Sequence, residues 1–119
     1  MRWEVEYTDQ FEDWWKTLDA HEQASLDVAV EALEVHGTGL GRPFVDSIKG
    51  SRHRNMKELR PVGGYVRVLF AFDPRRMAIL LIGGDKLNRW RSWYDEMLPV
   101  ADELYEEHLT TLREEGLLP

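Results

Sequence analysis

The chain has 119 residues, a length that builds one hydrophobic core but not two. Hydrophobic residues make up 43% and charged residues 31% of the sequence, which is typical of a globular domain and not of a disordered or membrane-spanning chain. The sequence has no cysteine, which excludes disulfides and thiolate metal sites. No apolar run approaches the ~20 residues of a membrane span. We therefore expect one cytoplasmic domain over residues 1–119, with no membrane partner.

Charge is unevenly distributed along the chain, whose net charge is −7. The stretch 42–91 holds 12 Lys and Arg against 4 Asp and Glu, a balance of +8, and the remainder holds 3 basic and 18 acidic residues, a balance of −15. Local potential governs the attraction of a charged ligand more than total charge does, so this basic middle is compatible with an anionic partner. The alternative is that the loops carry solvated bases and the helices carry solvated acids.

The first third of the chain predicts a strand followed by two helices. Residues 3–7 alternate large apolar and acidic side chains, as in a half-buried strand. The spacing of Asp9 and Glu12 is that of a capping box and predicts a helix ending near Leu18. Asp19 and Glu22 repeat the signal, and this second helix is expected to stop at residue 37, a glycine. Two helices with almost no loop between them predict a helical hairpin packed on a sheet.

The middle of the chain predicts a three-stranded antiparallel meander. Its strands are the apolar runs 56–60, 65–72 and 77–82, separated by the turn sequences PVGG and DPRR. We expect strand 3–7 to join them, because alone it would leave its backbone unpaired. Residues 88–97 form a further helical segment with Trp90 and Trp93, which either pack in the core or stack on a base. Proline breaks a helix interior, so Pro99 is expected to open a separate final helix that ends near Glu114.

These elements predict an α+β fold: an N-terminal strand and helical hairpin packed on an antiparallel sheet, with a C-terminal helix and the helices gathered on one side. The set 66, 68, 70 and 72 is wholly apolar and should face the helices. Arg67 then points to the opposite, open face, where Glu58 and Arg60 join it if the register permits. Lys86, at the end of the third strand, reaches the same rim.

Two explanations of this charged group remain open. It suits metal-free RNA cleavage, in which a 2′-hydroxyl attacks the adjacent phosphodiester and requires a base, cations for the phosphorane and an acid. Glu58 would be the base, Arg60 and Arg67 the cations, and Lys86 or His53 further support. The alternative is a cross-strand ladder of ion pairs without chemistry. The basic loop residues Arg52, His53 and Arg54 likewise either contact phosphate or form a solvated connector.

Other chemistry is not indicated by the sequence. The four histidines lack metal-ligand spacing, and neither GxxxxGK[ST] nor GxGxxG occurs, so no metal and no cofactor is expected. No serine lies in a GxSxG setting, and there is no cysteine to act as a nucleophile.

The run MKELRPVGGYVRVLFAFDPRRMAILLIGGDK, after a β-α-α start, resembles the RelE/HigB-type toxins of type II toxin–antitoxin systems, in particular their phage-derived Gp49-like branch. The shared pattern is an ELR strand, a glycine turn, a YRV-type strand, a D-x-R turn, an aliphatic strand and a lysine. The resemblance implies a RelE/ParE-like fold, ribosome-dependent cleavage of mRNA and a cognate helix-turn-helix antitoxin. It implies catalytic roles for Glu58, Arg60, Arg67 and Lys86. Further RNA contacts are expected from Arg52, His53, Arg54, Lys57, Tyr65, Arg89 and Arg91.

Two rival functions fit the same resemblance. One is a ParE-like, non-enzymatic inhibitor of DNA gyrase, for which the charged group would be dispensable. The other is an inactive relic whose basic face only holds an acidic antitoxin segment.

Overall fold

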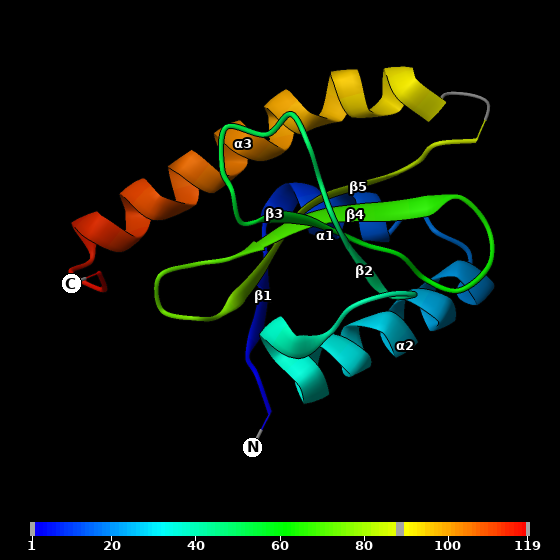
Figure 1. Ribbon diagram of the computed structural model, residues 1–119, viewed down its shortest axis with the longest axis horizontal. Helices are drawn as coiled ribbons and strands as arrows, with labels where there is room; N and C mark the ends of the chain where they lie inside the picture. The colour runs from blue at the N-terminus through cyan, green and yellow to red at the C-terminus, as the bar shows by residue number, and fades with distance from the viewer. Residues whose placement is uncertain (1, 88–89, 119) are drawn as a thin grey trace.

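Five strands form one mixed sheet in the order β1-β5-β4-β3-β2 in the computed structural model, which describes residues 2–87 and 90–118. The helices are α1 (Asp9–Trp15), α2 (Ala20–His36) and α3 (Trp90–Glu114), with the short 3-10 turn η1 (Gly37–Gly39) after α2. The strands are β1 (Val5–Tyr7), β2 (Val45–Ser47), β3 (Met56–Leu59), β4 (Val66–Phe72) and β5 (Ala78–Asp85). The α+β prediction is thus confirmed (Figure 1).

The predicted meander is present as β3, β4 and β5, each antiparallel to the next. The N-terminal strand joins it as expected, but it pairs parallel to β5, which makes the sheet mixed. Sequence analysis missed β2, which pairs antiparallel to β3 at the far edge. Three residues of the sequence VDS, with a single buried apolar side chain, are too short to give an alternating pattern.

The helical hairpin packs on one face of the sheet. The N-cap of α1 is Thr8, one residue before the predicted Asp9, because the side chain of Thr8 accepts the hydrogen bond from Phe11 N. The helix ends at Trp15, short of Leu18. The capping box at the start of α2 and the glycine at its end are both as predicted. Val68, Phe70 and Phe72 face this hairpin in a core completed by Phe11, Leu26, Ala29 and Leu33.

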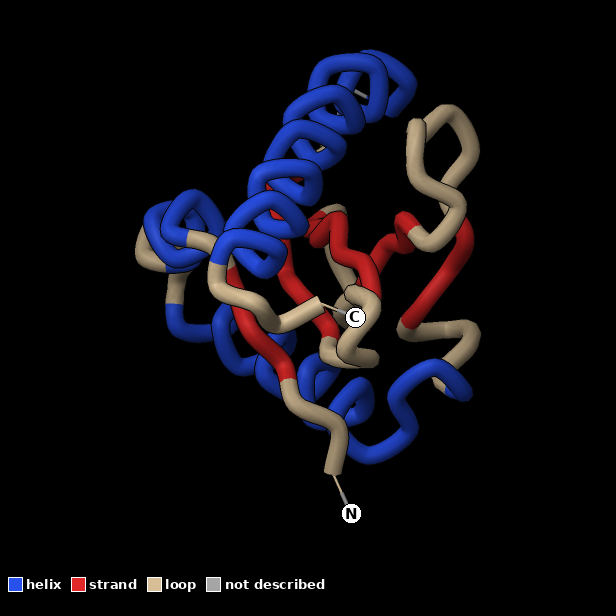
Figure 2. The backbone as a smooth tube through the Cα atoms, turned by 90° about the vertical axis from the view of Figure 1, so that its left-hand side faces the viewer, coloured by secondary structure: helices blue, strands red, loops and turns tan. Residues whose placement is uncertain are grey.

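The long helix α3 covers the opposite face, so the expectation that all helices lie on one side was wrong. Figure 2 shows the strands running between α3 and the other two helices. The core under α3 contains Met56, Leu69, Ala71, Leu81, Trp93, Leu98, Ala101 and Tyr105. The alternation of β4 concealed this second core, because the face carrying Arg67 also carries Leu69 and Ala71, both completely buried. Among the described residues, no helix, α3 included, is long and apolar enough to cross a bilayer.

Pro99 lies inside α3 and does not open a separate helix, which corrects the sequence expectation. A proline in a helix interior removes one hydrogen bond and costs ~3 kcal/mol. Burial of an apolar stripe on both sides of Pro99, with Trp93 and Leu98 before it and Ala101 and Leu104 after it, favours one continuous helix over two.

Gly83 and Gly84 lie in β5, where each allows a close approach of another part of the chain. A Cβ at Gly83 would overlap the ring of Trp14, and a Cβ at Gly84 would overlap the ring of Trp93. Successive residues of a strand point to opposite faces, so the two glycines let one tryptophan from α1 and one from α3 pack directly on either side of β5.

Replacing Gly83 with alanine should therefore destabilise the protein. The added methyl would have to displace the Trp14 indole, and overpacking of this kind costs about 1–3 kcal/mol. Gly39→Ala is the matched control, because a Cβ there meets nothing within 4 Å. Urea unfolding should show a lower midpoint for Gly83→Ala and an almost unchanged one for Gly39→Ala. Equal midpoints for both variants would contradict the packing described for Trp14.

Candidate functional site

Three of the predicted catalytic side chains lie together at one end of the sheet, beneath the first turns of α3. Glu58 on β3 is opposite Leu69 on β4, which places it diagonally across from Arg67 on the same face. Arg67 is in turn opposite Gly84 of β5, and Lys86 follows the end of that strand. We call Glu58, Arg67 and Lys86 the charged cluster. Their exposed fractions are 5%, 7% and 3%, so all three charges are almost completely removed from solvent.

The carboxylate of Glu58 is held from two sides. Arg67 Nε lies 3.2 Å from Glu58 Oε1 and forms an ion pair, although Arg67 Nε has no partner with hydrogen-bond geometry among the described residues. Arg67 Nη1 donates instead to the carbonyl of Val66 at 2.7 Å. The hydroxyl of Tyr94, from α3, donates to the same Glu58 Oε1. Burial and this hydrogen bond raise the pKa of Tyr94, so the phenol keeps its proton and serves as a donor.

Lys86 completes the charged cluster from the end of β5. Its Nζ lies 3.4 Å from the Tyr94 hydroxyl oxygen and 5.5 Å from the centre of the Tyr94 ring. Burial and the positive charge of Arg67 lower the pKa of Lys86, and Glu58 opposes this shift. A lowered pKa brings an ammonium group closer to the range in which it can release a proton during a reaction.

Arg60 lies at the rim and not in the charged cluster. It follows β3, its side chain is about one third exposed, and its Nη1 lies 3.5 Å from Asp46 Oδ2 on β2. Together with Arg67 it lines a cavity of about 280 Å³, whose other walls are Pro43 and the turn 61–64. This arginine cavity has one member of the charged cluster, Arg67, in its wall, and its two arginines carry the guanidinium groups that phosphate prefers.

The basic loop before β3 is tied to α3. Arg52 makes two hydrogen bonds to Glu106, at 3.1 and 3.0 Å, and His53 Nε2 lies 3.2 Å from the same carboxylate. The buried carboxylate of Asp102 accepts hydrogen bonds from Ser51 Oγ and from Arg52 N. Glu106 and Asp102 therefore bind the loop residues that were predicted to contact RNA. The sequence did not indicate these contacts, because the two acids lie about 50 residues further along the chain.

The remaining predicted RNA contacts are dispersed. Arg54 and Arg91 are exposed, and Tyr65 is 46% exposed beside the arginine cavity. Lys57 lies on the opposite face of β3 from Glu58, as strand alternation requires. Arg89 lies outside the described residues. Trp93 is 1% exposed, so it belongs to the core and is not available to stack on a base.

Tyr94 is the member of this site that sequence reasoning missed. It lies 36 residues after Glu58, in a helix that was expected to pack on the other face of the sheet. No spacing rule connects a helical tyrosine to a strand carboxylate. The available signal was that Trp93 and Tyr94 are adjacent large aromatics soon after Lys86, which is typical of a helix start packed closely on the strand end.

Removing the Tyr94 hydroxyl should reduce any reaction that depends on Glu58. A hydrogen bond to a charged group contributes about 1.5–3 kcal/mol, and loss of orientation at a catalytic base is expected to slow turnover roughly tenfold or more. In an assay of the mRNA cleavage that the sequence resemblance implies, Tyr94→Phe should therefore be slower than wild type. The matched control is Tyr105→Phe on the same helix, which loses contacts to Asn55 and Phe72 O but none to the cluster. Equal cleavage rates for both variants would remove Tyr94 from the site.

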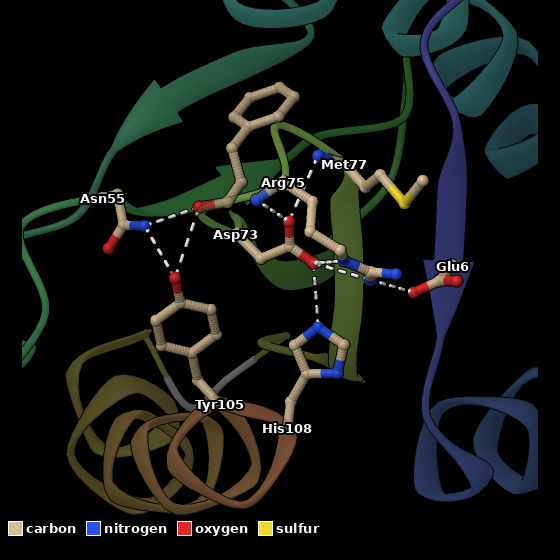
Figure 3. A network of polar contacts seen from close by, with 8 residues as sticks. Glu6, Asn55, Asp73, Arg75, Met77, Tyr105 and His108 are labelled. Atoms are coloured by element: carbon tan, nitrogen blue, oxygen red, sulfur yellow. Dashed lines mark hydrogen bonds and ion pairs between the residues drawn. The ribbon is translucent and has the colours of Figure 1, made fainter. Parts of the chain in front are cut away.

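A second buried polar network lies at the other end of β5 (Figure 3). Asp73 is its centre: Oδ2 accepts hydrogen bonds from Arg75 Nη2 at 2.7 Å and pairs with His108 Nε2 at 2.9 Å. Arg75 also reaches Glu6 on β1 at 2.5 Å. Glu6, Asp73 and His108 are metal-ligating types with atoms within 4.8 Å of one another. The guanidinium of Arg75 lies between the two carboxylates and already supplies the positive charge that a metal ion would bring.

Comparison with known proteins gives a consistent set of relatives. The family model for phage-derived Gp49-like proteins matches residues 13–106. "Putative toxin HigB3" of Mycobacterium tuberculosis (strain ATCC 25618 / H37Rv) is 49% identical over 102 residues, 86% of this chain and 90% of that protein. "Putative toxin HigB2" of the same strain is 50% identical over 99 residues, 81% of this chain and 49% of that protein.

Solved structures show the same fold at low sequence identity. A chain of the RelB-RelE antitoxin-toxin complex from Methanococcus jannaschii has a TM-score of 0.58 and 16% identity, covering 76% of this chain and 96% of that chain. At this identity the match establishes the fold alone.

Proposed function

Because the chain belongs to the phage-derived Gp49-like family and has the RelE-type toxin fold, we propose that it is the toxin of a type II toxin–antitoxin system. Its activity is ribosome-dependent cleavage of mRNA. Residues 1–119 form the toxin domain, and its partners are the ribosome, mRNA and a cognate helix-turn-helix antitoxin. The name of the M. tuberculosis relative supports the toxin assignment, and the M. jannaschii antitoxin-toxin complex supports the antitoxin partner.

The proposal that the protein is an enzyme rests on one observation. Glu58, Arg67 and Lys86 are buried together, so that two cations share one carboxylate. Removing charges from water is costly, and an ion-pair ladder needs no second buried cation. Strongly desolvated ionisable groups beside a cationic cavity are characteristic of catalytic sites. The arginine cavity provides the approach for a phosphodiester.

In the proposed reaction each side chain of the site has one role. Glu58 accepts the proton of the 2′-hydroxyl, whose oxygen attacks the adjacent phosphorus. A 2′,3′-cyclic phosphate forms as the bond from phosphorus to the 5′-oxygen breaks, and Lys86 donates the proton that the leaving oxygen takes up. Arg67 and Arg60 stabilise the negative charge on the phosphorane. Tyr94 holds Glu58 through Oε1, and Oε2 is the oxygen that accepts the substrate proton.

An in vitro translation reaction distinguishes this function from its rivals. Purified protein should cut ribosome-bound message at defined positions, leaving ends that carry a 2′,3′-cyclic phosphate or its hydrolysis product. A gyrase inhibitor would leave the message intact and block supercoiling of plasmid DNA. An inactive relic would do neither and would only bind its antitoxin. Either of these last two results overturns the proposed activity.

A further inference from the structure

A second cavity adjoins the arginine cavity across the turn between β3 and β4. It has a volume of about 200 Å³ and is lined by His21, Glu22 and Ser25 of α2, by the turn 61–64, and by Tyr65, Val66 and Asp85. We call it the turn pocket. In Figure 1 the green loop between β3 and β4 reaches the beginning of α2, where this pocket lies. It is smaller than the ~300–1,000 Å³ typical of drug-sized ligands and suits a single planar ring system.

The two cavities share the residues of the turn but differ in charge. Both are lined by Pro61, Val62, Gly63 and Gly64. The arginine cavity adds Arg60 and Arg67, on the side of the sheet covered by α3. The turn pocket adds the carboxylates of Glu22 and Asp85, on the side covered by α2. A phosphate is therefore attracted to the first cavity and repelled by the second, whereas a neutral ring with N–H donors fits the second.

The apolar surface of the turn pocket is suited to stacking. Tyr65 is 46% exposed and Val62 is 67% exposed, although both are large apolar side chains. Bases unstacked from an RNA strand are recognised by aromatic stacking and by hydrogen bonds to their edges. Carboxylates accept from the exocyclic amino group of a base and are repelled by a carbonyl at the same position.

We propose that the turn pocket binds a nucleobase next to the phosphate held in the arginine cavity, and that it favours an amino-bearing base over uracil. Tyr65 stacks on the base, and Glu22 or Asp85 accepts from its amino group. This inference rests on the proposed function and specifies the substrate that the same site takes.

The two pyrimidine mononucleotides CMP and UMP are matched probes, because they differ only along one edge of the ring. Cytosine has an exocyclic amino group and an unprotonated N3 there, and uracil has a carbonyl oxygen and an N3–H. Titration of each into the purified protein, followed by NMR chemical shifts, should give tighter binding of CMP by about fivefold or more. Asp85→Asn and Glu22→Gln keep the oxygen that each uses locally, towards Leu87 N and Asp19 N. At least one of them should remove the preference for CMP.

Tyr65→Ala should weaken the binding of both nucleotides by about fivefold to a hundredfold, the usual effect of losing one stacking platform. Tyr7→Ala is the control, because Tyr7 is 56% exposed on β1 and lines neither cavity of the turn. The proposal is overturned if CMP and UMP bind equally, if neither binds, or if Tyr65→Ala and Tyr7→Ala behave alike. Nucleotide binding is measured without ribosomes, so failure of mRNA cleavage with the CMP preference intact would count against the proposed activity and not against the pocket.

Discussion

Replacing Arg67 with alanine is expected to reduce the cleavage of ribosome-bound mRNA by about a hundredfold to a thousandfold, the usual effect of removing one preorganised charge from a transition state. Arg67 is 7% exposed, pairs with Glu58 at 3.2 Å and lines the arginine cavity, so its charge is fixed in place before the substrate binds. Cells that express Arg67→Ala without an antitoxin should therefore grow, whereas cells that express the wild-type protein should arrest.

Arg67→Ala also leaves Glu58 buried without its partner, which can cost 3–5 kcal/mol of stability and confuse loss of fold with loss of function. Arg60→Ala resolves this, because Arg60 is about one third exposed and contributes to the same cavity without burying a charge. It should remain folded and lose at least tenfold in rate. Arg113→Ala, an exposed site in the last turn of α3, is the matched control. Toxicity as high in folded Arg67→Ala and Arg60→Ala as in Arg113→Ala would remove the site assignment.

Replacing Asp73 with alanine is expected to cause a large loss of stability, about 3–5 kcal/mol. Its side chain is completely buried, and it accepts from Arg75, from His108 and from the backbone N–H groups of Arg75 and Met77. Its removal leaves a cation and several donors without their acceptor. Urea unfolding measures the effect, with Glu12→Gln as control, because the exposed Glu12–Lys16 pair contributes only about 0.3–0.5 kcal/mol.

Asp73 should also make the free energy of unfolding depend on pH in the acidic range. Burial raises the pKa of Asp73, but hydrogen bonds from Arg75, His108 and Met77 N outweigh it and lower the pKa below its ordinary value. The folded state therefore binds the proton less readily than the unfolded state does. The stabilisation is fully present above the unfolded pKa of about 3.9 and is lost as pH falls towards the folded value. The stability difference between wild type and Asp73→Asn should shrink below about pH 4, and a constant difference down to pH 2 would contradict the described network.

Much of the sheet was predictable because strand alternation is a strong local signal. Val68, Phe70 and Phe72 identified one core face, and the same alternation placed Arg67 opposite them. The clustering of Glu58, Arg67 and Lys86 followed from the meander alone, since neighbouring antiparallel strands bring such positions together.

The features that the sequence did not reveal depend on contacts between residues far apart in the chain. The cover formed by α3 was missed because Pro99 suggested a break and because the buried charges on its face of the sheet resembled a solvent-exposed side. Asp73 was expected only to form a turn. Its direct partner His108 lies 35 residues after it, and Arg75 bridges it to Glu6, which lies 67 residues before it. Side-chain networks of this kind have no periodicity that a single sequence displays.

The most direct measurement is primer extension on a single message incubated with the purified protein, with and without ribosomes, for wild type and for Arg60→Ala. We predict defined cuts only in the ribosome-bound message, strongly reduced in the variant while its unfolding midpoint is unchanged. Intact message under both conditions, or cuts of equal strength in wild type and variant, would contradict the assignment of this site to mRNA cleavage.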